Sequence, residues 1–316
     1  MKEIGGYFGL EQLVSDPYYP ELIAVNNARS ALAYILRARK VRKIFLPYFL
    51  CGSVARLCAE EGCPVEYYRI DADFLPVFER KLDEGEFLYI VNYYGQITPE
   101  RTATLKARYG SIILDNVQAF FQRPVCGVDT VYSCRKYFGV PDGGYVSTTA
   151  ILPAPMPQDV SMGRMKHILG RFEGRSASDY YADFKANDRS FVGLGLRAMS
   201  ALTKNLLGAI DYESVRRQRN ENYAVLKELL GGRNPLELTV PDGPFAYPFY
   251  CKNGMEIKKR LAEKKIFVPT LWPDVLEQEG TLEKDYAANI LPLPCDQRYD
   301  GADMQYICEM LLQLIG

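Results

Sequence analysis

The feature that most constrains this fold is the alternation of short apolar runs and helically spaced stretches in the first half of the chain. The apolar runs are rich in β-branched and aromatic residues and are short enough to be buried strands. They lie at 43–47, 65–70, 87–92, 112–115 and 130–133. Helical spacing is found at 30–39, 54–61, 75–82 and 99–109. Strands that alternate with helices need crossover connections, so the sequence predicts an α/β fold with a mainly parallel central sheet flanked by helices.

Polar side chains lie where three of these predicted strands end. The residues concerned are Asn92, Asp115 and Ser133. The carboxyl ends of parallel strands meet at one edge of a sheet, and ligands of such sheets bind there. We therefore expect a site at this edge.

After Thr149 the alternation stops. Residues 151–190 are rich in proline, methionine, glycine and charge, which predicts a long and partly irregular excursion. Connections of this length are uncommon unless they serve a function. A helical pattern follows at 194–230 and ends at a glycine pair, a common helix stop.

The last part of the chain, 236–316, alternates again and predicts a small C-terminal α+β domain. Its strand-like runs are 245–251 and 266–268, and its helical stretches are 255–264 and 303–315. We divide the chain into a large domain, 1–205, and a small domain, 206–316.

The composition argues against several classes of function for this chain. The chain has 316 residues and a formal net charge of −1, so neither nucleic acid nor an anionic membrane is an expected partner. Its eight cysteines form no CxxC pair and it has one histidine, which predicts no metal site. The most apolar long segment, 192–210, contains Arg197 and Lys204 and is typical of a buried helix rather than a membrane span. No apolar run follows the first residues, so we expect a cytoplasmic protein without a signal peptide.

Lys136 is the most specific chemical signal in the chain. It follows the strand-end Asp115 by about twenty residues, within a segment that contains Ser133. A lysine amine can condense with the aldehyde of pyridoxal phosphate as a Schiff base, and an aspartate can keep the pyridine nitrogen protonated. A loop lysine taken alone is usually a solvated surface residue. The two residues in this order favour a pyridoxal-phosphate site.

The order of these segments resembles the DegT/DnrJ/EryC1/StrS family, the sugar aminotransferase group of the fold-type-I pyridoxal-phosphate enzymes. Residues 114–119 read Leu-Asp-Asn-Val-Gln-Ala where the family has Glu-Asp-Ala-Ala-Gln-Ala. Residues 91–96 resemble its Val-His-Leu-Tyr-Gly segment, and residues 26–32 occupy the place of its Ser-Gly-Thr-x-Ala-Leu turn. Residues 4–8 and 291–294 resemble the two ends of the family pattern.

The resemblance implies a role for each matching residue. Lys136 would hold the cofactor and move the proton, and Asp115 would bind the pyridine nitrogen. Gln118 would lie near the 3-hydroxyl, and Val117 would press on one face of the ring. The phosphate would be bound by Ser133, Ala28 and Arg29.

The phosphate assignment also has a basis in the residues themselves. A helix is predicted to begin near Ser30, and a helix N-terminus binds anions readily. The alternative is that Asn27 simply caps this helix. The two interpretations are compatible.

The chain also departs from the family pattern. Lys136 follows Ser133 by only three residues, which places Arg135 beside the amine. That cation would lower the pKa of the lysine or bind a substrate anion. The ring that stacks on the cofactor falls at or near Cys51, which has none.

Other aromatic residues remain open at this stage. Tyr48 or Phe49 could supply the missing ring, although core packing is favoured for Phe49. Trp272 could cover the site, but packing within the small domain is favoured. Tyr7 and Tyr94 are further candidates for the substrate side, with Arg135.

The resemblance implies an aminotransferase that takes an amino group from an amino acid, glutamate, and gives it to a keto-sugar, nucleotide-linked. It also implies a homodimer. Two alternatives stay open. One is a pyridoxal-phosphate-dependent dehydratase or lyase, although the dehydrating branch of the family has histidine in place of Lys136. The other is a non-catalytic protein of the same fold, which would need neither Asp115 nor Lys136.

Overall fold

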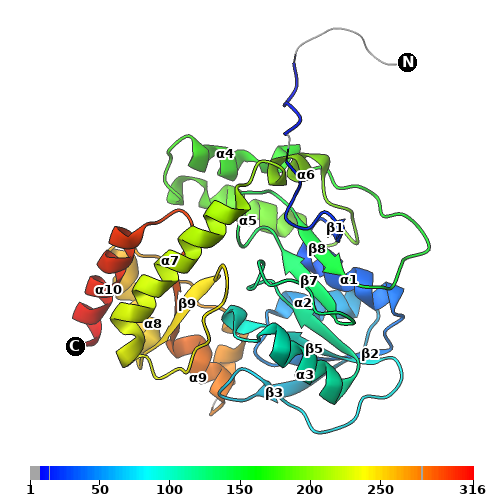
Figure 1. Cartoon of the computed structure of the whole chain (residues 1–316), viewed down its shortest axis with the longest axis horizontal. Helices are drawn as coiled ribbons and strands as arrows, with labels where there is room; N and C mark the ends of the chain where they lie inside the picture. The colour runs from blue at the N-terminus through cyan, green and yellow to red at the C-terminus, as the bar shows by residue number, and fades with distance from the viewer. Residues whose placement is uncertain (1–7, 14, 279) are drawn as a thin grey trace.

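The computed structural model describes residues 8–13, 15–278 and 280–316. Its centre is an eight-stranded sheet of order β1-β8-β7-β6-β5-β2-β3-β4 (Figure 1). The strands are β1 (Ile23–Val25), β2 (Lys43–Pro47), β3 (Val65–Ile70), β4 (Pro76–Val77), β5 (Glu86–Val91), β6 (Ile112–Asp115), β7 (Asp129–Ser133) and β8 (Gly144–Ser147).

The inner part of this sheet is parallel, as the alternation predicts. Strands β3, β2, β5, β6 and β7 pair in parallel, and β1, β8 and β4 add antiparallel edges. In the register, Asp115 is paired with Val91 on β5 and with Val131 on β7. The carboxyl ends of these three strands therefore lie side by side.

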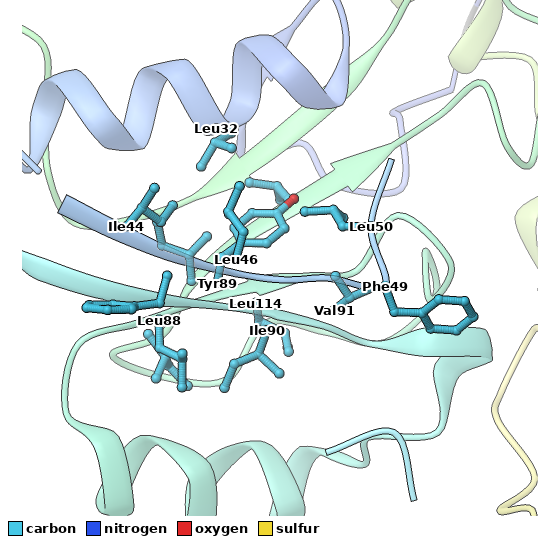
Figure 2. Packing of buried hydrophobic residues seen from close by; sticks show 14 of the residues in the cluster. Leu32, Ile44, Leu46, Phe49, Leu50, Leu88, Tyr89, Ile90, Val91 and Leu114 are labelled. Carbon is cyan, nitrogen blue, oxygen red and sulfur yellow. The ribbon is translucent and has the colours of Figure 1, made fainter. Parts of the chain in front are cut away.

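Helices cover both faces of the sheet. Helix α1 (Ala28–Ala38) contacts β7 and β8, and α3 (Pro99–Tyr109) contacts β6. Alternation along β5 sends Leu88 and Ile90 to the α3 side, while Tyr89 lies on the face that Leu32 of α1 covers (Figure 2). Helix α2 (Gly52–Glu60) packs beside α1. The fully buried side chains between these layers form the large core.

One predicted helix is absent because its start is a turn. At 75–82 the structure has the short strand β4, not a helix. The Asp71 carboxylate accepts hydrogen bonds from the backbone N–H groups of Asp73 and Leu75, and Phe74 between them is left-handed with φ 62°. This local turn sends the chain back antiparallel to β3.

The excursion after β8 is more helical than its composition predicts. It contains α4 (Lys166–Phe172) and α5 (Tyr181–Ser190), which contact each other. The helix predicted at 194–230 is in fact two, α6 (Ala201–Leu207) and α7 (Tyr212–Leu230). Asp211 caps the second by accepting from the Ser214 N–H at 3.0 Å, so the chain turns between them.

The C-terminal part has a core of its own beside the sheet (Figure 1). It is made of α7, β9 (Ala246–Tyr250), α8 (Gly254–Glu263), β10 (Ile290–Pro294) and α10 (Gly301–Ile315), with β9 and β10 antiparallel. The run 266–268 forms no strand. By contrast, Trp272, Val275 and Tyr286 pack into the large core, the last from α9 (Leu282–Asn289). Among the described residues, no helix combines the length and apolar character needed to cross a bilayer.

Candidate active site

A cavity of about 230 Å³ lies at the carboxyl edge of the sheet. Eight of the predicted site residues line it: Ala28, Arg29, Cys51, Asp115, Val117, Ser133, Arg135 and Lys136. These residues come from the start of α1, the loop before α2 and the ends of β6 and β7. The parallel register brings these distant segments together, as the sheet rule predicts.

Asp115 lies at the bottom of the site as the last residue of β6, and it is buried. Its Oδ2 accepts a hydrogen bond from the Tyr89 hydroxyl at 2.7 Å, and its Oδ1 accepts one from the Val117 N–H at 2.9 Å. Burial raises the pKa of this carboxyl, while the Lys136 charge and the two hydrogen bonds oppose the rise. The carboxylate is thus held rigidly, with a cation nearby to favour its ionised form.

Lys136 lies in the turn after β7. Water reaches the side chain through the cavity, yet protein atoms surround it closely enough for burial to lower the pKa of its amine. Asp115 and Cys51 oppose this shift. Within the described part of the chain, no oxygen accepts a hydrogen bond from Nζ, which lies 5.5 Å from the centre of the Phe245 ring. A lysine whose pKa is lowered presents more neutral, nucleophilic amine.

Arg135 was predicted to lower the pKa of the Lys136 amine, and the cause given in that prediction is wrong. Burial, rather than Arg135, lowers the lysine pKa. The Arg135 guanidinium instead forms an ion pair of 2.7 Å with Asp188 of α5, which offsets its charge. It lines both this cavity and a second one described below.

The start of α1 has the geometry of an anion site. Asn27 caps the helix by accepting from the Ser30 N–H at 2.9 Å, which leaves the first-turn amides of Ala28 and Arg29 without an intrahelical partner. A Cβ on Gly144 would lie 2.8 Å from the Asn27 carbonyl carbon, so only glycine lets β8 pass this close to the turn. The two interpretations of this turn, a helix cap and an anion site, are therefore compatible in the structure.

Gln118 is buried behind the cavity and is not part of its lining. Its Oε1 accepts from the Tyr94 N–H at 2.8 Å, whereas its Nε2 has no hydrogen-bond partner. A buried donor without a partner is costly and commonly indicates a missing group. Val117 lines the cavity directly, and Cys51 is exposed in it with its sulfur 3.2 Å from the Ser53 hydroxyl.

Of the two predicted substrate tyrosines, the structure describes only Tyr94, which does not line the cavity. Tyr7 lies outside the described residues. Tyr94 is 1% exposed and packs its ring against Phe74 and Trp272. Its burial follows from a left-handed backbone, φ 54°, that turns the side chain inward after β5.

The aromatic alternatives at Cys51 are also resolved. Phe49 is fully buried in the core, as favoured from the sequence. Tyr48 stacks on Tyr67 outside the cavity. Trp272 packs in the large core, as favoured from the sequence, and it also lines the cavity.

Tyr89 is a site residue that the sequence analysis missed. It lines the cavity and binds Asp115, and alternation along β5 was the available signal, because Tyr89 and Val91 share the face that leads to the site.

A larger cavity of about 650 Å³ adjoins the first, and Lys136 and Arg135 line both. Its other walls come from residues 137–140, from the excursion and from the C-terminal part. They include four basic side chains, His167, Arg171, Arg219 and Arg298, and the Asp296 carboxylate, which forms an ion pair of 2.7 Å with Arg298. Arg219 is 1% exposed and donates only to uncharged acceptors, Gln297 Oε1, Pro244 O and Tyr137 O. Burial lowers the pKa of both Arg219 and His167.

No group of acidic, histidine and cysteine side chains that could hold a metal ion occurs among the residues that the structure describes.

Solved structures of similar shape include several that are named as aminotransferases. A DegT DnrJ EryC1 StrS aminotransferase from Brucella abortus has a TM-score of 0.63 and 18% identity, over 93% of this chain and 86% of that one. PseC from Helicobacter pylori has a TM-score of 0.63 and 15% identity, over 93% and 86%. DesV from S. venezuelae, in complex with a ketimine intermediate, has a TM-score of 0.63 and 15% identity, over 93% and 84%.

These likenesses confirm the predicted fold. The chain has the architecture of the DegT/DnrJ/EryC1/StrS aminotransferases over nearly its whole length. No family model matches the sequence, and no curated protein matches it either.

Proposed function

We propose that this protein is a pyridoxal-phosphate-dependent aminotransferase of the DegT/DnrJ/EryC1/StrS type. It would move an amino group from an amino acid, glutamate, to a keto-sugar carried on a nucleotide. The observation that carries the proposal is the presence of Lys136 and Asp115 in one cavity at the carboxyl edge of the sheet. Pyridoxal phosphate, when bound, supplies an electron sink next to the reacting carbon of the substrate.

The donors and acceptors around the cavity fit this cofactor. Asp115 offers a fixed carboxylate for the pyridine nitrogen. The free amides at the start of α1 and the Ser133 hydroxyl at the end of β7 suit a phosphate. Gln118, expected near the 3-hydroxyl, does not line the cavity, and its unpartnered Nε2 is buried.

Lys136 would have two tasks. Its amine would hold the cofactor through the aldehyde, and it would serve as the base that moves the proton at the substrate carbon. Its lowered pKa favours both, because each task uses the neutral form of the amine.

Borohydride reduction after cofactor loading, followed by peptide mapping, tests this assignment. We expect the pyridoxyl group on Lys136. Lys258 is the matched control, since burial also lowers the pKa of its amine, to about 8. That amine donates to the carbonyls of Ala287 and Ala288 and is not in the cavity. A label on Lys258 or another lysine would exclude the proposed site.

Incubation of the loaded protein with glutamate separates this function from its alternatives. A transaminase forms pyridoxamine phosphate and 2-oxoglutarate in equal amounts. A lyase or dehydratase would release a product without that stoichiometry, and a non-catalytic protein would leave the cofactor unchanged.

The basic second cavity supports an anionic acceptor. Arginine suits phosphate because its planar fork donates two parallel hydrogen bonds. Arg135 lies at the junction of both cavities, where a substrate must meet the amine. A charged hydrogen bond contributes about 1.5–3 kcal/mol, so Arg135→Ala should weaken inhibition by a nucleoside diphosphate by about ten- to a hundredfold.

Asp188→Asn is the control, because it removes the ion-pair partner and keeps the arginine. It should change that inhibition by less than about threefold while cofactor loading stays intact in both variants. If nucleotides do not inhibit the wild-type enzyme, a smaller keto acceptor replaces the nucleotide-linked sugar.

We also propose a homodimer with the sites near the subunit boundary. The excursion presents apolar side chains to solvent, among them Met162 at 79% and Phe172 at 86% exposure. Exposed apolar side chains that gather on one segment commonly indicate an interface. Sedimentation at assay concentration should give a dimer, and a fully active monomer would contradict the proposal.

A further inference from the structure

We infer that Trp272 provides the aromatic surface against which the pyridine ring of the bound cofactor packs. This inference rests on the proposed function. It concerns a residue of the C-terminal part that sequence position alone does not connect with Cys51.

Cys51 leaves a place for such a ring. It lies in the cavity at the position where the family resemblance puts the stacking side chain, and it has no ring to offer. Among the described aromatic residues only Tyr89 and Trp272 line this cavity. The Tyr89 hydroxyl is committed to Asp115 at 2.7 Å. Of the two, Trp272 lies in the segment that is bound to Gly52, next to Cys51.

The structure fastens Trp272 beside Cys51. Two residues after the tryptophan, the Asp274 carboxylate accepts a hydrogen bond from the Gly52 N–H at 2.9 Å, next to Cys51 in the chain. A Cβ on Gly52 would lie 2.8 Å from the same carboxylate oxygen, so the two segments are in close contact. Residues separated by more than two hundred positions thus form one wall of the cavity.

Aromatic side chains support the indole away from the cavity. The Phe49 ring centre lies 4.4 Å from that of Trp272, and the Tyr93 ring meets it edge-on at 5.1 Å. Neither ring lines the cavity. The indole is 8% exposed, so its orientation is set by packing before any ligand arrives.

The backbone of Trp272 is held in an unfavourable conformation. Its φ of 51° and ψ of 54° lie in the left-handed region, which a bulky side chain seldom adopts. Such a conformation persists where surrounding contacts determine it, and it is frequent at ligand sites. Here it turns the indole to the cavity at the start of the 3-10 turn Pro273–Glu277.

Cofactor affinity tests the inference. Apo protein is titrated with pyridoxal phosphate, and binding is followed by the absorbance of the lysine-bound form. Trp272→Leu should weaken affinity about tenfold, whereas Trp272→Phe, which keeps a ring, should stay within about threefold. Phe49→Leu is the matched control: it removes a ring from the same cluster and should lower thermal stability without changing affinity more than about threefold.

Two further readouts report on ring contact. The circular dichroism of the cofactor absorption band should change in Trp272→Leu and persist in Phe49→Leu, because it depends on the asymmetric surroundings of the ring. Trp272 is also the single tryptophan of the chain, so oxidation by N-bromosuccinimide monitors it in the wild-type protein. Bound cofactor should slow that oxidation at least about tenfold, a result that needs no variant to fold.

The outcomes separate this inference from the proposed function. If pyridoxal phosphate labels Lys136 while Trp272→Leu keeps wild-type affinity and dichroism, the stacking role is refuted and the function remains. Equal loss of affinity in Trp272→Leu, Trp272→Phe and Phe49→Leu would also refute it, in favour of a purely structural cluster. If the wild-type protein binds no pyridoxal phosphate, both fail.

Discussion

Asp115→Asn should abolish most turnover while leaving the fold nearly as stable as before. The change keeps the side-chain volume and removes the charge. The carboxylate now accepts from the Tyr89 hydroxyl and from the Val117 N–H through separate oxygens. An amide has one oxygen, so one of these two donors loses its acceptor.

Two opposing effects act on the free energy of unfolding of the apo protein. A buried donor without an acceptor costs about 1–3 kcal/mol. Burial raises the pKa of Asp115, so ionising it in the folded protein also costs free energy, about 1.4 kcal/mol for each unit of pKa. The amide avoids this second cost. The two effects oppose each other, so the net loss should stay below the upper limit of about 3 kcal/mol for the lost acceptor alone.

The pH dependence gives the sign of the ionisation effect. The folded pKa of Asp115 is raised above its ordinary value of 3.8, so the folded protein binds more protons than the unfolded chain between the two pKa values. This group therefore makes the apo protein less stable as pH rises through that window. Asp115→Asn should lack this component, which urea unfolding at several pH values would measure.

Catalysis should respond far more strongly. A preorganised charge in a site of this kind is worth about 2.7–4 kcal/mol, which corresponds to about a hundred- to a thousandfold in rate. Single-turnover formation of pyridoxamine phosphate from glutamate is the assay. Tyr89→Phe is the control: it removes one hydrogen bond and keeps the carboxylate, and should slow the reaction less than about tenfold. If Asp115→Asn retains more than a tenth of the wild-type rate, Asp115 does not face the pyridine nitrogen.

Three further changes test the surroundings of the site. Asn27→Ala removes the cap of α1 and should lower the free energy of unfolding by about 1 kcal/mol in denaturant titration. Gly144→Ala would place a methyl group 2.8 Å from backbone atoms of Asn27 and Tyr132, so it should cost about 1–3 kcal/mol and weaken cofactor binding by shifting the start of α1. The pKa of Lys258 is lowered to about 8 from 10.5, so the unfolded chain binds more protons between these values and stability should rise with pH there. Lys258→Met should flatten that rise in thermal unfolding at pH 8 and 10.

Local patterns in the sequence were sufficient for the central sheet and for the two residues on which the proposed chemistry depends. Strand and helix periodicity act within a few residues, so the five predicted strands between 43 and 133 are found as β2, β3, β5, β6 and β7, whereas β1, β4 and β8 were not predicted. The side chains of Asp115 and Lys136 follow strands whose direction the crossover rule sets. Their meeting in one cavity was therefore predictable, and so was the cap at Asn27.

Errors arose where a local interaction competes with the periodic pattern. The Asp71 turn converts the helix expected at 75–82 into a hairpin, and the Asp211 cap divides the helix expected at 194–230. Hydrogen bonds from side chains to the backbone determine the structure at these places, and the spacing of hydrophobic residues does not reveal them.

Tertiary structure alone decided which side chains surround the cavity. It buries Tyr94 and pairs Arg135 with Asp188 of the excursion. It also brings Trp272 to the cavity that contains Cys51, through contacts between segments more than two hundred residues apart. Such contacts depend on how two cores pack against each other, whereas sequence periodicity extends over only a few turns of helix or one strand. The sequence by itself therefore determined the parallel strands and their reactive edge, and the packing of the C-terminal part brought Trp272 to the wall of the site.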